Sequence, residues 1–355
     1  MEVIFTKQTE YLNKWDEFVT KNGKGNHLIY SDWLASYKNY GFDYEIGLVI
    51  ENEEIIGGYG AVIAKFLFFK FYIVPHGPIF IEQQEDKFSN LIIELKNRAL
   101  KLSCCYFQFS FPVSNSQQIE PFVYKKNNFK VPFDLKKGTL FKFIYSSYGI
   151  NWVAFDNCKS ADELLKKFSI QVRRNIKLSC KNNATIGFAT TVEQCKLAYN
   201  LIEQNAQKGN YTVRSFQDFS STILSLIKKE KVFFIVAKIN NEIKGVSILV
   251  DNGNYLSYIS GGTSKEKPDL KLGYLLHWEA IKKSFELGYS GYNISMGGSK
   301  GVVDFKSKFN TTSIYFDNPH HYFILKPVVF KIYSSLNAIL AKNKKLISKL
   351  YKFFK

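Results

Sequence analysis

Residues 255–310 read YLSYISGGTSKEKPDLKLGYLLHWEAIKKSFELGYSGYNISMGGSKGVVDFKSKFN, and their pattern of apolar residues indicates the fold class. Its apolar patterns predict a strand over 255–259, a helix over 271–287 and a second strand over 291–295. A helix between two successive strands is the crossover of a parallel pair, so the stretch predicts a mixed α/β fold with a helix packed on a sheet.

The same order of elements occurs in the first half of the chain. There the patterns predict two helices, a hairpin, a strand, a crossover helix and a strand, over residues 12–20, 31–37, 46–50 with 55–64, 67–74, 85–102 and 105–111. The second half begins with helices over 161–181 and 192–208 and a hairpin over 232–238 and 242–250. The two hairpins share identical residues at one constant offset: Asn52, Glu54, Ile55, Gly57 and Asn240, Glu242, Ile243, Gly245. We therefore expect an ancient duplication, with one domain over 1–150 and a second over 151–318.

Composition limits the partners and the compartment. The chain has 355 residues, enough for about two domains, and its net charge of +17 favours phosphate-bearing partners or an anionic membrane surface. The five cysteines include no C-x-x-C pair, which fits a reducing cytoplasm, and the five histidines show no metal-ligand spacing. No signal peptide or transmembrane segment is visible, so we expect a cytoplasmic protein. Because no metal-ligand spacing is present, we also expect no metal, and we expect no other cofactor.

The element order resembles the GNAT acyltransferase fold in tandem, and residues 255–310 resemble the FemABX family of peptidoglycan-bridge aminoacyltransferases. The most specific matching motif is Gly301-x-x-x-Phe305-Lys306-x-x-Phe309. Further matching motifs are Leu276-x-Trp278, Glu286-x-Gly288-Tyr289, Gly297-Gly298, Arg173-Arg174-Asn175-Ile176, Gly209-x-x-x-x-Arg214-Ser215, Trp33 and Pro75-x-Gly77-Pro78.

The resemblance implies transfer of an aminoacyl group from aminoacyl-tRNA to an amine of a lipid-linked peptidoglycan precursor. Two departures matter: Ser31 stands where the family has a lysine, and no Arg/Gln-x-x-Gly-x-Gly/Ala loop for coenzyme A is present. One alternative is acylation of an amino sugar or lipid in surface polysaccharide synthesis with a thioester donor. Another is a non-catalytic relative that binds RNA or membrane.

The candidate catalytic residues are Lys306 and Asp304. A fixed ammonium at Lys306 would stabilise the oxyanion formed when an amine attacks an ester, or hold a donor phosphate, whereas the alternative is a solvated basic loop. Asp304 would accept the amine's proton or simply pair with Lys300 or Lys308.

The candidate binding residues fall into three groups. Gly297 and Gly298 allow a sharp turn that aims backbone N–H groups into a cleft, and Phe305 is a substrate contact or core. By resemblance, Arg214 and Tyr258 reach the cell-wall precursor and Trp33 packs near its sugar or peptide. Because Arg173, Arg174 and Lys177 share a helix, they are candidates for a tRNA or pyrophosphate contact, or form a solvated face.

The segment 319–355 carries eight lysines and no acidic residue. Apolar residues recur along it with helical period from Val329 to Phe354, which predicts a basic amphipathic helix. We expect its first part to dock on the first domain and its end, from about Leu336, to contact the anionic inner face of the membrane.

Overall fold

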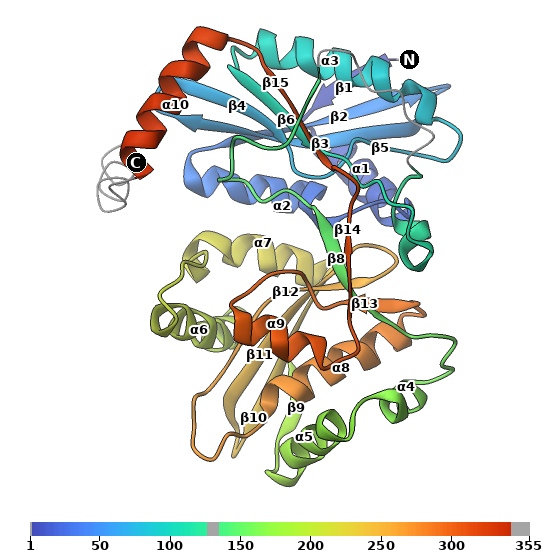
Figure 1. Ribbon diagram of the computed structural model, residues 1–355, viewed down its shortest axis with the longest axis vertical. Coiled ribbons are helices and arrows are strands. Elements are labelled where there is room, and N and C mark those ends of the chain that lie inside the picture. The colour runs from blue at the N-terminus through green and yellow to red at the C-terminus, as the bar shows by residue number, and fades with distance from the viewer. Residues whose placement is uncertain (1, 126–134, 342–355) are drawn as a thin grey trace. The chain divides into compact units, whose positions relative to one another are not determined.

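The computed structural model describes residues 2–125 and 135–341 and divides into two compact units (Figure 1). Unit 1 consists of Met1–Tyr148 and Phe316–Lys355, and unit 2 of Gly149–Tyr315. Each unit is one mixed sheet with helices packed on it, which confirms the predicted α/β fold class.

The sheet of unit 1 has the strand order β1-β2-β3-β4-β6-β15-β7, with the short β5 paired to β3. Its strands are β1 (Glu2–Thr6), β2 (Asp43–Glu51), β3 (Glu54–Phe66), β4 (Phe69–Val74), β5 (Ile79–Phe80), β6 (Tyr106–Ser110), β7 (Lys136–Lys137) and β15 (His320–Ile324). Its helices are α1 (Thr9–Lys21), α2 (Ser31–Ala35), α3 (Phe88–Lys101) and α10 (Pro327–Ala341), with short 3-10 turns η1 (His27–Ile29), η2 (Ser36–Tyr40), η3 (Glu85–Lys87) and η4 (Gln117–Phe122).

The sheet of unit 2 has the strand order β14-β8-β13-β12-β11-β10-β9. Its strands are β8 (Gly149–Ala154), β9 (Thr185–Phe188), β10 (Val232–Ile239), β11 (Glu242–Asp251), β12 (Leu256–Thr263), β13 (Gly291–Asn293) and β14 (Thr312–Tyr315). Its helices are α4 (Ala161–Lys167), α5 (Ile170–Lys181), α6 (Val192–Lys208), α7 (Phe216–Lys228), α8 (Leu272–Glu286) and α9 (Lys300–Ser307).

The two sheets have the same topology. In each, a hairpin is followed by a parallel pair joined through a crossover helix, β4-α3-β6 in unit 1 and β12-α8-β13 in unit 2. The hairpins also share an irregularity: Ile56 is skipped in the pairing of β2 with β3, and Lys244 is skipped in the pairing of β10 with β11. The two bulges occupy equivalent positions of the sequence repeat, so the structural repeat extends to a local detail of strand pairing.

One strand of each sheet comes from a distant part of the chain. β8 follows unit 1 in sequence but pairs with β13 in unit 2, and β15 follows unit 2 but pairs with β6 in unit 1. Residues 320–324, in the segment predicted as a helical tail, are therefore a sheet strand, and the helix α10 begins only at Pro327.

The helices bury their apolar faces on both sides of each sheet. In unit 2, α8 packs with α4 and α5 on one face, and α6 with α7 covers the other. In unit 1, α3 packs on the face that carries Tyr72 and Phe107, while Phe330 and Tyr333 of α10 pack against Phe71 and Tyr106 on the opposite face. The first part of the predicted tail thus contacts the sheet of unit 1; residues 342–355 lie outside the described residues.

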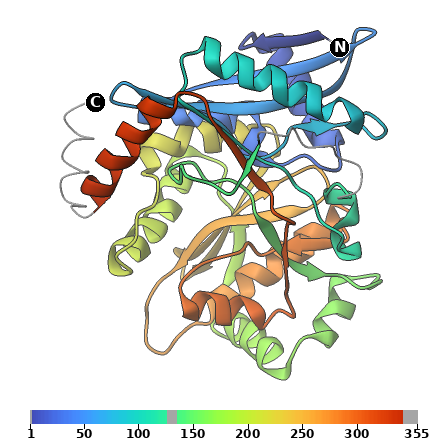
Figure 2. The same cartoon turned by 45° about the horizontal axis from the view of Figure 1, so that its top comes forward.

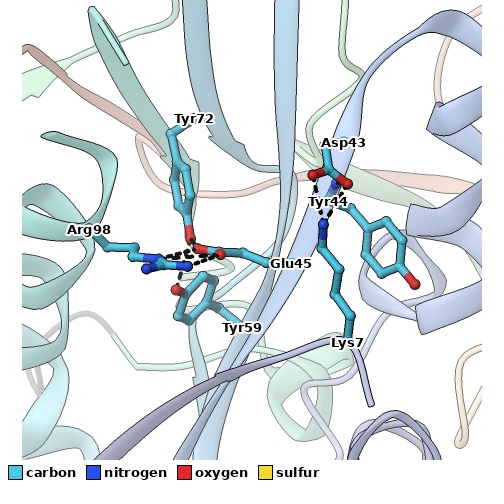
Figure 3. A network of polar contacts seen from close by, with 7 residues as sticks. All are labelled: Lys7, Asp43, Tyr44, Glu45, Tyr59, Tyr72 and Arg98. Carbon is cyan, nitrogen blue, oxygen red and sulfur yellow. Dashed lines mark hydrogen bonds and ion pairs between the residues drawn. The ribbon is translucent and has the colours of Figure 1, made fainter. Parts of the chain in front are cut away.

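A buried polar network crosses the α3 face of unit 1 (Figure 3). Arg98 of α3 donates to both carboxylate oxygens of Glu45 on β2, and the Tyr72 hydroxyl donates to Glu45 Oε1 at 2.6 Å. The Tyr59 hydroxyl lies 2.8 Å from that of Tyr72, and its ring covers Gly47, where a Cβ atom would clash with it. Since the charge is paired and hydrogen-bonded, Glu45 is stable in the interior.

One sequence prediction needs correction. The helix expected over 161–181 is broken at Phe168, whose backbone is extended, because Ser169 begins α5 as an N-cap that accepts from the Val172 N–H. Lys306, for which a solvated basic loop was the alternative interpretation, lies on a helix, α9.

Candidate functional site

A pocket of about 890 Å³ lies within unit 2. Its walls come from the end of β12, the neighbouring β11, the first turns of α8, the helix α9 and the C-terminal end of α6. Its lining includes Ser247, Tyr258, Gly261, Gly273, Tyr274, His277, Phe305 and Lys306.

The pocket lies where two parallel strands separate. β12 and β13 pair only through Leu256 with Tyr292 and Ser257 with Asn293, although β12 continues to Thr263. Ile259 is skipped in the pairing of β12 with β11, and this bulge changes the direction of the strand next to Tyr258. Beyond Ser257, the edge of β12 that faces β13 therefore has no paired strand, and the pocket lies next to this part of β12.

Lys306 is a buried lysine in the wall of this pocket, with only 4% of its surface exposed. Its Nζ donates to the Ser295 carbonyl at 3.1 Å, the Ser295 hydroxyl at 2.9 Å and the Gly297 carbonyl at 3.1 Å. Among the described residues no carboxylate pairs with it, and burial lowers the pKa of Lys306 to about 8. The ammonium is therefore oriented by neutral oxygens, and its charge is not neutralised within the described part of the protein.

An aromatic ring lies beside the ammonium, and a histidine packs on that ring. Lys306 Nζ lies 5.5 Å from the ring centre of Tyr258, a distance at which a cation is attracted to the ring face. The His277 ring packs against Tyr258, and its Nδ1 lies 3.0 Å from the Tyr292 hydroxyl. Burial, together with the charge of Lys306, lowers the pKa of His277 to about 3, so this imidazole is neutral at physiological pH.

The rim of the pocket is positive. Lys208, Lys265, Lys267 and Lys271 line it together with the acids Glu266 and Asp269. Both acids are engaged: Lys244 pairs with Glu266 at 3.0 Å, and Lys271 pairs with Asp269 at 2.8 Å. A cleft with this excess of lysine attracts anionic ligands.

Three of the candidate catalytic and binding residues, Gly297, Gly298 and Asp304, lie differently from the sequence-based expectation. The Gly297 carbonyl accepts from Lys306, whereas its N–H was expected to face a ligand, and neither Gly297 nor Gly298 lines the pocket. Asp304 is exposed on α9 outside the pocket, and in the described part of the chain it forms no ion pair with Lys300 or Lys308. Phe305 and Tyr258 do line the pocket, together with Lys306.

The three predicted phosphate-binding residues, Arg173, Arg174 and Lys177, line a second hollow in unit 2. This cavity of about 370 Å³ is also lined by Lys181 and by two apolar neighbours on α5, Ile170 and Leu178. No acid lines this hollow, so it presents four cationic side chains along one helix face.

The remaining candidates lie away from the Lys306 pocket. The Arg214 guanidinium lies 4.8 Å from the centre of the Phe219 ring, and Arg214 does not line the pocket. Trp33 is buried in unit 1 and contacts His27 edge to face. Ser31, the residue that replaces the family lysine, donates from its hydroxyl to Asp16 at 2.5 Å and so holds α2 to α1.

Sequence reasoning missed Ser295 and the role of His277 as a pocket residue. Ser295 has a left-handed backbone with φ of +66°, which turns its carbonyl and its hydroxyl toward the same ammonium. The signal present in the sequence was a polar residue between strand and Gly-Gly turn, which is common to many loops. Nothing in the residue pattern linked it to Lys306.

Neither a metal site nor a membrane span is found in the described ranges. No three His, Cys, Asp or Glu side chains there gather as metal ligands, and none of the helices there is long and apolar enough to cross a bilayer.

Comparison with known proteins supports the fold. Residues 166–307 match the model of an acetyltransferase (GNAT) domain. A crystal structure of FemX superimposes with a TM-score of 0.75 at 14% identity, covering 94% of this chain and 99% of that one. A conserved protein of unknown function from Bacteroides thetaiotaomicron VPI-5482 gives 0.61 at 11% identity over 90% and 99% of the two chains.

A tandem GNAT protein from the clavulanic acid biosynthesis pathway gives a TM-score of 0.51 at 8% identity, covering 91% of this chain and 99% of that one. A search among curated proteins found no match. The chain therefore has a FemABX-like fold of two tandem GNAT-type units, and the match to the acetyltransferase (GNAT) domain model lies in the second of them.

Proposed function

We propose that this chain is an N-acyltransferase that moves an aminoacyl group from aminoacyl-tRNA to an amine of a lipid-linked peptidoglycan precursor. The observation that carries the proposal is the Lys306 ammonium, buried in a pocket wall and oriented by three neutral oxygens. The FemX-like fold and the match to the acetyltransferase (GNAT) domain model over 166–307 support the reaction class.

The reaction is aminolysis of an ester. The amine nitrogen attacks the ester carbonyl, a C–N bond forms, the C–O bond to the ribose breaks, and the amine's proton goes to the departing hydroxyl oxygen. The pre-oriented ammonium stabilises the negative charge that develops on the carbonyl oxygen through its own positive charge, because its three N–H groups already donate to Ser295 and Gly297. Because an activated ester needs no covalent enzyme intermediate, holding amine and ester in line supplies much of the remaining acceleration.

In this proposal the pocket holds the aminoacyl end of the donor. Tyr258 and Phe305 pack against its apolar part, and the rim lysines attract the phosphates next to it. This assigns Tyr258 to the donor, whereas the family resemblance alone implies a contact with the precursor. The exposed position of Asp304 supports no role for it as the base, and the neutral His277 is too weak a base to replace it.

The hollow on α5 is assigned to the donor's RNA. Arg173, Arg174 and Lys177 provide sequence-independent phosphate contacts, which make binding depend strongly on salt. Arg214 and Trp33 are assigned to the acceptor, and the basic C-terminal segment to the membrane in which a lipid-linked acceptor lies.

A second candidate is favoured by the acetyltransferase domain match itself. In it the same pocket receives a thioester donor, and the acceptor is an amino sugar or a lipid in surface polysaccharide synthesis. The positive rim suits the phosphates of such a donor equally well.

One experiment separates these candidates. The protein is incubated with charged tRNA and lipid-linked precursor, or with acetyl coenzyme A and amino sugars, and the acceptors are weighed by mass spectrometry. A mass increase of one amino-acid residue with charged tRNA supports the first candidate, and acetylation supports the second. No mass change in either arm contradicts both and leaves the non-catalytic alternative.

Substitution of Lys306 tests the assignment of the site. Lys306→Ala should abolish the mass increase, while Lys308→Ala, at the end of the same helix but outside the pocket, should retain it. Equal activity of the two variants would show that Lys306 has no catalytic role.

A further inference from the structure

Unit 1 carries exposed apolar side chains on three neighbouring segments. They are Phe68 in the turn between β3 and β4, Phe143 in the segment before β8, and Val328 and Ile332 on α10, with 68%, 53%, 74% and 47% of their surfaces exposed. We call these four residues the apolar patch. Exposed side chains of this size are ordinary singly, but grouped they mark an interaction surface.

Ring contacts connect Phe68 and Phe143 to one buried residue, Tyr333 of α10. Phe68 packs on Phe69, whose ring lies 5.5 Å from that of Tyr333. Phe143 packs on Phe141, whose ring lies 6.4 Å from Tyr333.

The helix completes the patch. Ile332 precedes Tyr333 on α10, and Val328 lies one turn before Ile332 on the same helix face. Figure 2 shows the turn between β3 and β4 beside α10.

The charges around the patch identify its partner. The turn reads KFLFFK over 65–70, the loop LFKFIY over 140–145 and the helix PVVFKIYSSLNAILA over 327–341; these segments contain four lysines and no acid. In the described part of the chain none of Lys65, Lys142 and Lys331 is ion-paired. Apolar side chains ringed by unpaired lysines match the interface of an anionic bilayer, where the rings enter the acyl boundary and the ammonium groups meet lipid phosphates.

The same charges disfavour the other occupants. The segment 342–355 has six lysines and no acid, so it would be repelled by the lysines of the patch. A second copy of the chain would bring its own lysines to the same surface.

We infer that the apolar patch of unit 1 is a docking surface for anionic membranes, separate from the basic C-terminal segment. This surface places the β3–β4 hairpin and the helix α10 of a folded unit at the bilayer, and not the end of the chain alone. The inference does not depend on the acyl-transfer reaction, since its test contains no substrate.

The test is flotation of the full chain with vesicles of phosphatidylcholine alone or mixed with phosphatidylglycerol. The triple variant F68S/V328S/I332S should bind the anionic vesicles at least tenfold more weakly than the unchanged protein. The matched control is F188S/L197S in unit 2, whose side chains are 50% and 61% exposed and lie outside the patch and both pockets, and it should bind normally. All substituted positions are exposed, so the variants should keep their melting temperature.

A second measurement reports insertion directly. Phe68→Trp adds an exposed indole to a protein whose four tryptophans are buried, and its emission should shift to the blue with anionic vesicles but not with phosphatidylcholine alone. Undiminished flotation of the triple variant would assign membrane binding to the C-terminal segment and overturn the inference. Dimers of the unchanged protein that become monomers in the triple variant would assign the patch to a second copy, and would overturn it as well.

Discussion

The Lys306 ammonium and Ser295 are joined by two hydrogen bonds, one to the carbonyl oxygen at 3.1 Å and one to the hydroxyl at 2.9 Å. The two residues come from different elements, α9 and the turn after β13. One residue thus supplies two of the three oxygens that fix the direction of a buried charge in the pocket wall. The chemistry proposed for the pocket depends on this charge.

The rate should fall as pH rises through about 8. Burial lowers the pKa of Lys306 to about 8, so the ammonium that stabilises the oxyanion is lost above this pH. The groups that face it, Tyr258 and His277, do not titrate there, because burial raises the pKa of the first and lowers that of the second to about 3. The measurement is kcat/KM against pH. Lys306→Arg should retain some activity and lose the falling limb, since a guanidinium stays protonated; a falling limb unchanged in this variant would contradict the assignment.

The stability of the protein should rise with pH between about 8 and 10 because of Lys306. The native pKa is about 8, against 10.5 for an unburied lysine, so in this window the unfolded chain binds more protons than the native one. Relative to Lys306→Met, the unchanged protein should gain about 2 kcal/mol over those two pH units. Urea unfolding of both proteins at several pH values measures the difference. A difference independent of pH would mean that the ammonium is well solvated in the folded state.

Ser295→Ala should lower the pKa of Lys306 further. The variant removes one acceptor from the ammonium and so disfavours the charged form. We expect kcat to fall about tenfold and the falling limb of the pH profile to move to lower pH. Ser295→Gly loses the same hydroxyl but suits the left-handed backbone at φ of +66° better. Matching pH profiles for both variants would attribute the shift to the hydroxyl; a profile that stays in place in both would exclude a positioning role.

Glu45→Gln should destabilise unit 1 by about 3 kcal/mol, because it leaves Arg98 without its carboxylate partner in a largely buried network. The control is Asp43→Asn. Asp43, two residues from Glu45, pairs with Lys7 at 2.6 Å on the surface (Figure 3), so this variant should lower the free energy of unfolding by less than about 1 kcal/mol. Hydrogen exchange of peptides from β2 and α3 measures both changes. Equal losses of protection in the two variants would mean that burial of Glu45 adds nothing to its ion pair.

Much of the fold was accessible from the sequence because its signals are local. The alternation of strand and helix patterns over 255–295 and the repeat of Asn52 and Gly57 as Asn240 and Gly245 predicted two mixed sheets, and the structure confirms them. The strands β8 and β15 escaped prediction, since short strands paired across more than a hundred residues leave no periodic signal of their own.

Local sequence patterns specify the order of the hairpins and crossover helices, the tandem fold and the basic, aromatic character of the chain. They also point to Lys306, though without showing whether this lysine is buried or solvated. That depends on the folded chain, because the environment of a charge is set by residues from other elements: the turn at Ser295 and Gly297, the ring of Tyr258, and the divergence of β12 from β13. For the same reason Asp304, two residues from Lys306, lies exposed outside the pocket: one helix directs neighbouring side chains to opposite sides.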